Sequence, residues 1–199
     1  MFQVRIHGRG GQATHGMARL LVRAAALDGW HAHLVAGGGP HRAGDPAVAH
    51  VELSVRPRTP APFESALDAV LVQDETLLYG TDVLAGLRRD GLALLNSAST
   101  WQQLGFGDRV AHLAPMRALA VPATRLTPAG QWPGATNAAL LGAFVAATGL
   151  VTATAMAVAI SRAVAARAAA DHVLAARRGR EHTVAEIRRL CAPLEAALR

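Results

Sequence analysis

The chain has 199 residues, of which 51% are hydrophobic and only 4% aromatic, so we expect a single domain, residues 1–199, with a largely aliphatic core. The formal net charge is +6, but the arginines that dominate it are scattered and carry no aromatic interleaving, which argues against a nucleic-acid partner. The single cysteine, Cys191, excludes a disulfide framework and, with no N-terminal signal pattern, favours the cytoplasm.

The first half of the chain alternates strand patterns with helix patterns. Apolar and polar residues alternate over residues 2–6, which predicts a strand that ends at a glycine run. Apolar residues then recur at helical spacing over residues 13–27, and Gly29 ends this helix. A further helix is expected to begin at Asp74, as its N-cap, and to continue to about Leu87. The remaining strands are predicted at residues 31–36, 47–55, 68–73 and 91–96.

The second half is predicted to be mostly helical after one more strand at residues 109–114. Residues 126–161 contain no charged side chain, which invites comparison with a membrane span. The prolines, glycines, threonines and Asn137 in this segment instead favour two buried helices, at about 135–147 and 152–170, and no membrane association. Strand and helix alternation predicts an α/β fold: a three-layer α/β/α, Rossmann-like arrangement with a largely parallel central sheet.

The glycine run, residues 8–13 with the sequence GRGGQA, fits the pattern G-x-G-x-x-G/A between a strand and a helix. Such a turn presents backbone amides at a helix N-terminus, where they favour a phosphate or another anion. A tight turn without a ligand is the simpler alternative. The first candidate anion contacts are Gly8, Arg9, Gly10, Gly11 and Gln12.

A nicotinamide dinucleotide would require an acidic residue at the end of the second strand, to bind the ribose hydroxyls. No Asp or Glu occurs there before Asp45, which counts against NAD. Arg42 could serve NADP or another phosphate instead. A self-contained NADP-type oxidoreductase or nucleotide-binding protein is therefore kept as an alternative.

Several blocks of the sequence, in order along almost the whole chain, carry a resemblance to one family. VRIHGRGGQ opens the chain, HRAGDPAVAHVELS follows at a second loop, and DAVLVQDETLL and GLALLNS form the next two strands. TNAALLGAFVAATGLV, residues 136–151, is a very close match, and EHTVAEIRR near the end is a looser one. Together these blocks resemble the gamma subunit of the 2-oxoacid:ferredoxin oxidoreductases, the pyruvate and ketoisovalerate enzymes.

The resemblance implies a complex that oxidatively decarboxylates a 2-oxoacid, joins the acyl group to coenzyme A and passes electrons through iron–sulfur clusters to ferredoxin. Thiamine diphosphate and the clusters are then expected on partner subunits: alpha, beta and a ferredoxin-like delta. The gamma subunit would frame the active-site region and share in coenzyme A binding. Expected contacts are the glycine run, Arg42 and Gly44 of the second loop, and Asn137, for which helix capping is the simpler explanation. No residue is assigned a catalytic or metal-binding role.

The chain departs from the family pattern at three positions. Ala13 stands where the family usually has glycine, and Ala43 where it usually has arginine, with Arg42 one place earlier. Thr183 stands where the family has an asparagine in the last helix. If the arginine that Ala43 replaces normally binds a phosphate, a different substrate or ligand preference is expected here. An assembly subunit with an empty loop is a third possible role.

Other polar residues have simpler explanations. Asn96 and Ser97 end a strand at the edge where open α/β sheets bind ligands, so they are either caps or ligand contacts. His31 and His33 share a strand face, but no ligand-like spacing accompanies them, and we expect no metal site. His7 is expected to support the glycine turn.

Overall fold

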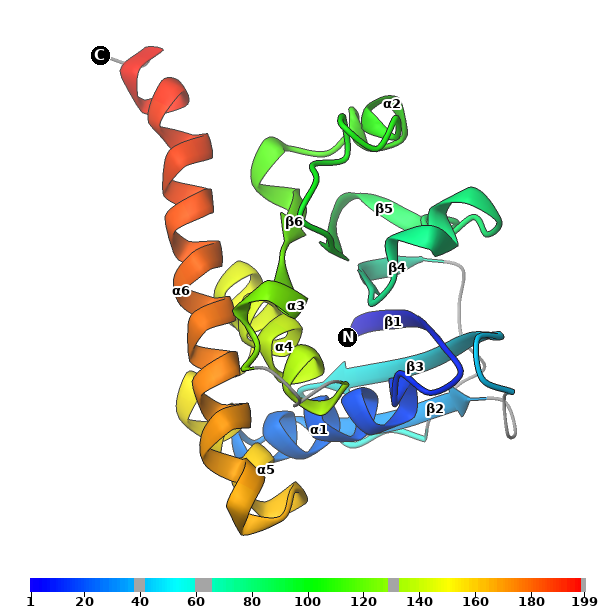
Figure 1. Ribbon diagram of the computed structural model, residues 1–199, viewed down its shortest axis with the longest axis vertical. Helices are drawn as coiled ribbons and strands as arrows, with labels where there is room; N and C mark the ends of the chain where they lie inside the picture. The colour runs from blue at the N-terminus through cyan, green and yellow to red at the C-terminus, as the bar shows by residue number, and fades with distance from the viewer. Residues whose placement is uncertain (38–41, 60–65, 129–132, 198–199) are drawn as a thin grey trace.

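The computed structural model describes residues 1–37, 42–59, 66–128 and 133–197. At its centre is a six-stranded sheet with the order β2-β3-β1-β4-β5-β6 (Figure 1). The strands are β1 (Phe2–Arg9), β2 (His31–Gly37), β3 (Pro46–Ser54), β4 (Leu67–Val72), β5 (Leu87–Asn96) and β6 (Ala118–Val121).

The sheet is mixed, with one strand running against the others. β1, β4, β5 and β6 pair in parallel, whereas β3 pairs antiparallel with both β1 and β2. Only residues 38–45 separate β2 from β3, too few for a crossover connection, which needs about a dozen residues. The expectation of a largely parallel sheet therefore holds, with β3 as its exception.

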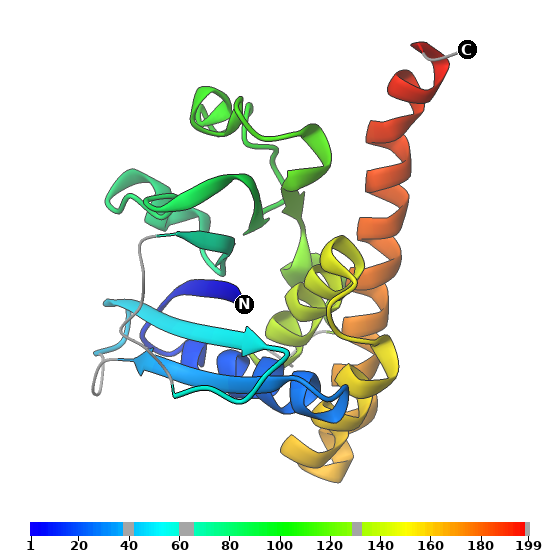
Figure 2. The same ribbon diagram turned by 180° about the vertical axis from the view of Figure 1, so that it is seen from behind.

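α1 (Thr14–Leu27), α4 (Gly134–Thr148) and α5 (Ala153–Ala163) lie on one face of the sheet (Figures 1 and 2). The long helix α6 (Ala166–Ala197) packs mainly on α4 and also reaches β6. The other face of β4 and β5 is covered by short helices and irregular segments, packed around buried side chains such as Trp101. The short helices of the chain are η1 (Glu75–Tyr79), α2 (Gly107–Val110), η2 (Pro115–Arg117) and α3 (Ala123–Leu126).

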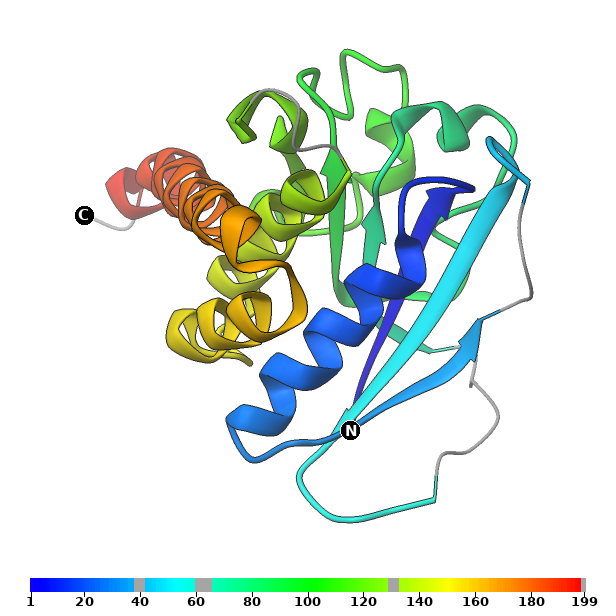
Figure 3. The same ribbon diagram turned by 60° about the horizontal axis from the view of Figure 1, so that its bottom comes forward.

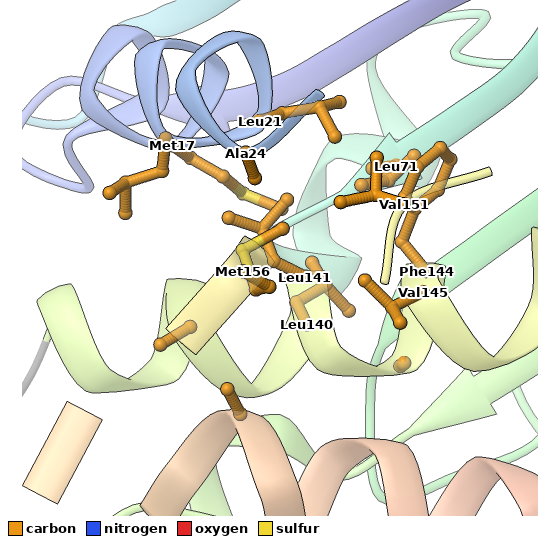
Figure 4. Packing of buried hydrophobic residues seen from close by; sticks show 14 of the residues in the cluster. Met17, Leu21, Ala24, Leu71, Leu140, Leu141, Phe144, Val145, Val151 and Met156 are labelled. Atoms are coloured by element: carbon orange, nitrogen blue, oxygen red, sulfur yellow. The ribbon is translucent and has the colours of Figure 1, made fainter. Parts of the chain in front are cut away.

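The larger core fills the space between the sheet and α1, α4 and α5 (Figure 4). Residues 135–145 of α4 are all buried, because α4 lies between α1 on one side and α6 on the other (Figure 3). A Cβ atom on Gly142 of α4 would overlap a backbone carbonyl of α6, and one on Gly179 of α6 would overlap a carbonyl of α4. The two helices are thus in backbone contact. Within the described residues, no helix is both long and apolar enough to cross a membrane.

Three predicted elements are wrong. The helix expected from Asp74 to Leu87 is only η1, because Gly80 ends it and a turn leads to Gly86, which has a φ of +79°. The strand expected at 109–114 is absent: the segment starts within α2, and β6 follows further on.

The helix expected at 152–170 is two helices rather than one. It breaks after Ala163, because Val164 adopts an extended conformation with φ −117° and ψ 158°. α6 then begins at Ala166. This break brings the end of α5 and His172 of α6 to a pocket that α1 also lines.

Candidate functional site

The candidate site lies at the carboxyl edge of the parallel strands, where β1 and β4 are neighbours. From β1 the chain continues through α1 to β2, which lies at one edge of the sheet. β4 and β5 lie between β1 and the opposite edge. Open α/β sheets bind ligands at such a point of reversal. The glycine run after β1, Gln73 and Asp74 after β4, and Asn96 at the end of β5 all meet here.

Two of the glycines are required by internal packing. The N–H of Gly10 donates to the Asp45 carbonyl over 2.7 Å, and the N–H of Gly44 donates to the Gly10 carbonyl over 3.0 Å. A Cβ atom on Gly10 would overlap the Arg42 carbonyl, and one on Gly8 would overlap the side chain of Gln73. Gly8 and Gly10 therefore serve close contacts within the chain.

Gly11 differs from its neighbours. It is exposed, its φ is +94°, and a Cβ atom there would meet no other atom within 4 Å. Ala13, two residues later, is also exposed and also left-handed, with a φ of +53°. The accessible part of the glycine run is thus its second half.

Gln73 is the centre of a buried hydrogen-bond cluster that the sequence analysis missed. Its Nε2 donates to the Asn137 Oδ1 over 2.5 Å and to the Gln12 carbonyl over 3.2 Å. Its Oε1 accepts from the Thr14 hydroxyl over 2.7 Å, and its N–H donates to the His7 carbonyl over 2.8 Å. The sequence contains one sign of this cluster, because Gln73 is a polar residue directly at the end of a mostly apolar strand.

Asn137 is part of this cluster. It is 4% exposed, and its Nδ2 donates to the Gln12 carbonyl over 2.9 Å while its Oδ1 accepts from Gln73. The expectation that it caps its helix is wrong, because α4 begins at Gly134 after Pro133. Asn137 instead ties α4 to the glycine run.

Arg9 has partners on three sides. Its Nη2 donates to the Thr76 hydroxyl over 2.7 Å and its Nη1 to the Gly44 carbonyl over 3.0 Å. Its Nε lies 3.5 Å from the Asp74 Oδ2. The Arg9 guanidinium therefore links the glycine run and the second loop to η1. The negative charge of Asp74 compensates its positive charge.

Asp74 is the N-cap of η1, as predicted. One of its oxygens accepts from the Thr76 N–H over 3.0 Å, and the other accepts from the Gln12 Nε2 over 2.8 Å. Burial raises the pKa of Asp74, but the hydrogen bonds from Thr76 and Gln12 and the charge of Arg9 outweigh it, so the pKa lies below its ordinary value. Asp74 is therefore ionised at neutral pH.

Gln12, Gln73 and Asp74 border a pocket of about 350 Å³, here called the crevice. Its lining includes two carboxylates, Asp74 and Glu75, and one arginine, Arg125. Asn96 and Ser97 also line it, as expected for a strand end, and Asn96 is bonded to the Gln73 carbonyl over 2.9 Å. The crevice suits a neutral or cationic group better than a phosphate.

The remaining sequence predictions fall in different places. Arg42 and Gly44 are exposed in the second loop, and Gly44 has a φ of +87°. His7 is 5% exposed, and burial together with Arg5 and His50 lowers its pKa to about 4. Among the described residues, no three His, Cys, Asp or Glu side chains are placed to hold a metal.

Comparisons with known proteins agree with the resemblance seen in the sequence. The model of the family pyruvate ferredoxin/flavodoxin oxidoreductase matches residues 3–182. The pyruvate/ketoisovalerate oxidoreductases common subunit gamma of Pyrococcus abyssi is 31% identical over 160 residues, 80% of this chain and 85% of that protein. Pyruvate synthase subunit PorC of Methanosarcina barkeri is 32% identical over 160 residues, with the same coverage.

Solved structures support the same relationship. Pyruvate oxidoreductase subunit PORC from Thermotoga maritima superposes with a TM-score of 0.73 at 26% identity, covering 90% of this chain and 95% of that one. The α/β fold, with its mixed sheet of six strands, is thus that of a known oxidoreductase subunit. The chain belongs to the pyruvate ferredoxin/flavodoxin oxidoreductase family, as a protein of the gamma-subunit type.

Proposed function

We propose that this chain is the gamma subunit of a multi-subunit 2-oxoacid:ferredoxin oxidoreductase. The complex would decarboxylate a 2-oxoacid, join the acyl group to coenzyme A and pass the electrons to ferredoxin. The observation that carries the proposal is the extent of the match, which spans 80% of this chain and 85% of a gamma subunit named for pyruvate and ketoisovalerate oxidoreductases.

The chemistry of decarboxylation and electron transfer is proposed to reside on partner chains. Alpha, beta and ferredoxin-like delta subunits would hold thiamine diphosphate and the iron–sulfur clusters. A cluster is held by several cysteine thiolates, and this chain has one cysteine. We therefore propose that the clusters are held by partner chains, and we assign no catalytic acid, base or nucleophile to this chain.

The proposed task of this chain is to frame the active-site region with the carboxyl edge of its sheet. The second half of the glycine run and the second loop are exposed there, through Gly11, Arg42 and Gly44. We propose that they contact the coenzyme A phosphates. Arg9 and Asn137 act on this contact indirectly, because their polar atoms already hold the two loops and α4 together.

A self-contained NADP-type oxidoreductase is less consistent with this geometry. In dinucleotide-binding folds the amides of the first turn face the pyrophosphate. Here the Gly10 amide faces the second loop, where it donates to the Asp45 carbonyl over 2.7 Å. This bond occupies part of the surface that a pyrophosphate would need.

Co-purification of the tagged full chain tests the subunit assignment. We expect a cysteine-rich chain and a thiamine-dependent chain to accompany it, and the complex to reduce ferredoxin only when a 2-oxoacid and coenzyme A are both present. Isolation of the chain alone, with micromolar affinity for NADPH, would instead support the alternative.

The coenzyme A contact is tested separately in the assembled complex. Arg42→Ala is expected to raise the KM for coenzyme A and leave the KM for the 2-oxoacid unchanged. Arg56→Ala removes an equally exposed arginine beyond the opposite end of β3 and serves as the control. Equal KM values in both variants would refute the contact and leave the subunit assignment intact.

A further inference from the structure

A second pocket lies on the helical side of the sheet, next to the glycine run. It has a volume of about 310 Å³ and is bordered by α1, the start of α4 and the junction between α5 and α6. We call it the α1 pocket. Its floor is apolar and includes Met17, Leu20 and Val164, whereas Arg19, Arg23 and His172 provide its polar groups.

The α1 pocket differs from the crevice in charge. Arg19 and Arg23 are four residues apart on α1, so they project from the same side of the helix. Both are exposed, and neither forms an ion pair within the part of the chain that the structure describes. No described residue that lines this pocket is acidic. Its two positive charges are therefore unopposed.

Two helix N-termini meet at the same place. α1 starts directly after Ala13, and α4 starts at Gly134, and both residues line the pocket. Neither helix has a side-chain cap hydrogen bond at its start. The first amides of a helix and its dipole favour an anion, so these termini add to the effect of the two arginines.

His172 is an independent indication of a ligand. It is only 7% exposed, and its Nδ1 is bonded to the Ala168 carbonyl over 2.8 Å. Its Nε2 faces the start of α4, where a Cβ atom on Gly134 would overlap it. This Nε2 forms no hydrogen bond with any described residue. A side chain that is more than nine-tenths buried and lines the pocket thus keeps one ring nitrogen for a bound group.

We propose that the α1 pocket binds the phosphate group of a small organic ligand. Arg19 and Arg23 form charge-assisted hydrogen bonds to it, the N-termini of α1 and α4 face it, and the Nε2 of His172 forms a further hydrogen bond to it. The apolar floor contacts the organic part of the ligand. The inference does not depend on the proposed function, because it rests only on the residues of this pocket.

The α1 pocket and the crevice are separated by the cluster around Gln73. Gln12 and Gln73 line the crevice, whereas Ala13 and Asn137 line the α1 pocket. A phosphate on the crevice side would meet Asp74 and Glu75. The lining charges therefore disfavour an anion inside the crevice and favour one in the α1 pocket.

Isothermal titration of the purified full chain with inorganic pyrophosphate, in about 0.15 M salt to screen weak surface contacts, tests the site. We expect saturable one-to-one binding that Arg19→Ala/Arg23→Ala weakens by about tenfold for each lost hydrogen bond. His172→Phe keeps the packing but lacks the nitrogen, and it is expected to weaken binding too. Arg188→Ala, another exposed arginine on a helix, is the matched control and is expected to bind normally.

Competition identifies the source of the phosphate. Displacement of pyrophosphate by coenzyme A but not by pantetheine, which lacks phosphate, would support the site with coenzyme A as its ligand. If coenzyme A does not displace pyrophosphate, the site is still supported, and its ligand is a different phosphorylated molecule. Absence of saturable binding, or an equal loss in Arg188→Ala, would overturn the proposal. Co-purification of partner subunits with Arg19→Ala/Arg23→Ala shows separately whether the subunit assignment stands.

Discussion

Replacing Ala13 by glycine is expected to stabilise the protein. Ala13 is exposed and adopts a left-handed conformation, with φ 53° and ψ 41°, directly before α1. Its side chain makes no cap hydrogen bond, so Ala13→Gly loses little beyond one exposed methyl group. The substitution removes the steric cost of a side chain at positive φ.

Two opposing terms set the size of this effect. A left-handed alanine costs roughly 1–2 kcal/mol, and a glycine loses roughly 0.5–1 kcal/mol more chain entropy on folding than an alanine. The expected net gain for Ala13→Gly is therefore about 0.5–1 kcal/mol. With a urea m-value of about 2 kcal/mol/M, the unfolding midpoint should rise by about 0.3–0.5 M.

Urea unfolding followed by circular dichroism measures this shift. Ala185→Gly makes the same substitution at an exposed position inside α6 and is expected to lower the free energy of unfolding by about 1 kcal/mol. Opposite signs for the two variants are the critical result. A midpoint for Ala13→Gly at or below that of the parent chain would refute the assignment of strain to this residue.

Three further predictions concern the loops and the sheet. Gly10→Ala should destabilise the chain by about 1–3 kcal/mol in urea unfolding, because the methyl group would overlap the Arg42 carbonyl; an unchanged midpoint would contradict the close approach of the two loops. Asn137→Ala should lower the free energy of unfolding by about 1–3 kcal/mol, because Gln73 loses a buried partner, and a neutral effect would argue against the cluster. His7 takes up a proton in the unfolded chain below its ordinary pKa of 6.5 but in the folded chain only near 4, so stability should fall as the pH decreases between these values. A His7→Gln variant should lose less stability over this range, and parallel pH profiles would exclude His7 as the cause.

The fold was predictable to the extent that each element carries its own periodicity. Alternation over residues 2–6 and the helical spacing over 13–27 correspond to β1 and α1 within a few residues. The charge-free segment is explained by α4, which is buried on all sides by neighbours that local sequence does not reveal. Predictions failed where short apolar stretches were ambiguous: Val110 and Leu113 face a core from a helical turn and a loop, not from a strand.

The candidate site was predictable only in outline. The glycine run and Asp74 lie together at the sheet edge because parallel strands end on the same side. Two features depend on contacts between segments that are distant in sequence. These are the hydrogen bond from the Gly10 amide to the second loop and the central position of Gln73 in its cluster. Arg19 and Arg23 have the pattern of an ordinary solvated helix face, and only the pocket beside them suggests another role.

The close packing of α4 against α6 has a consequence for biosynthesis. During translation α4 leaves the ribosome well before the residues of α6 that cover it, since Gly179 is the partner of a helix that ends at Thr148. A helix with no charged side chain is then exposed to solvent on the nascent chain. A chain that ends between these two helices would keep this apolar surface uncovered and would be prone to aggregate.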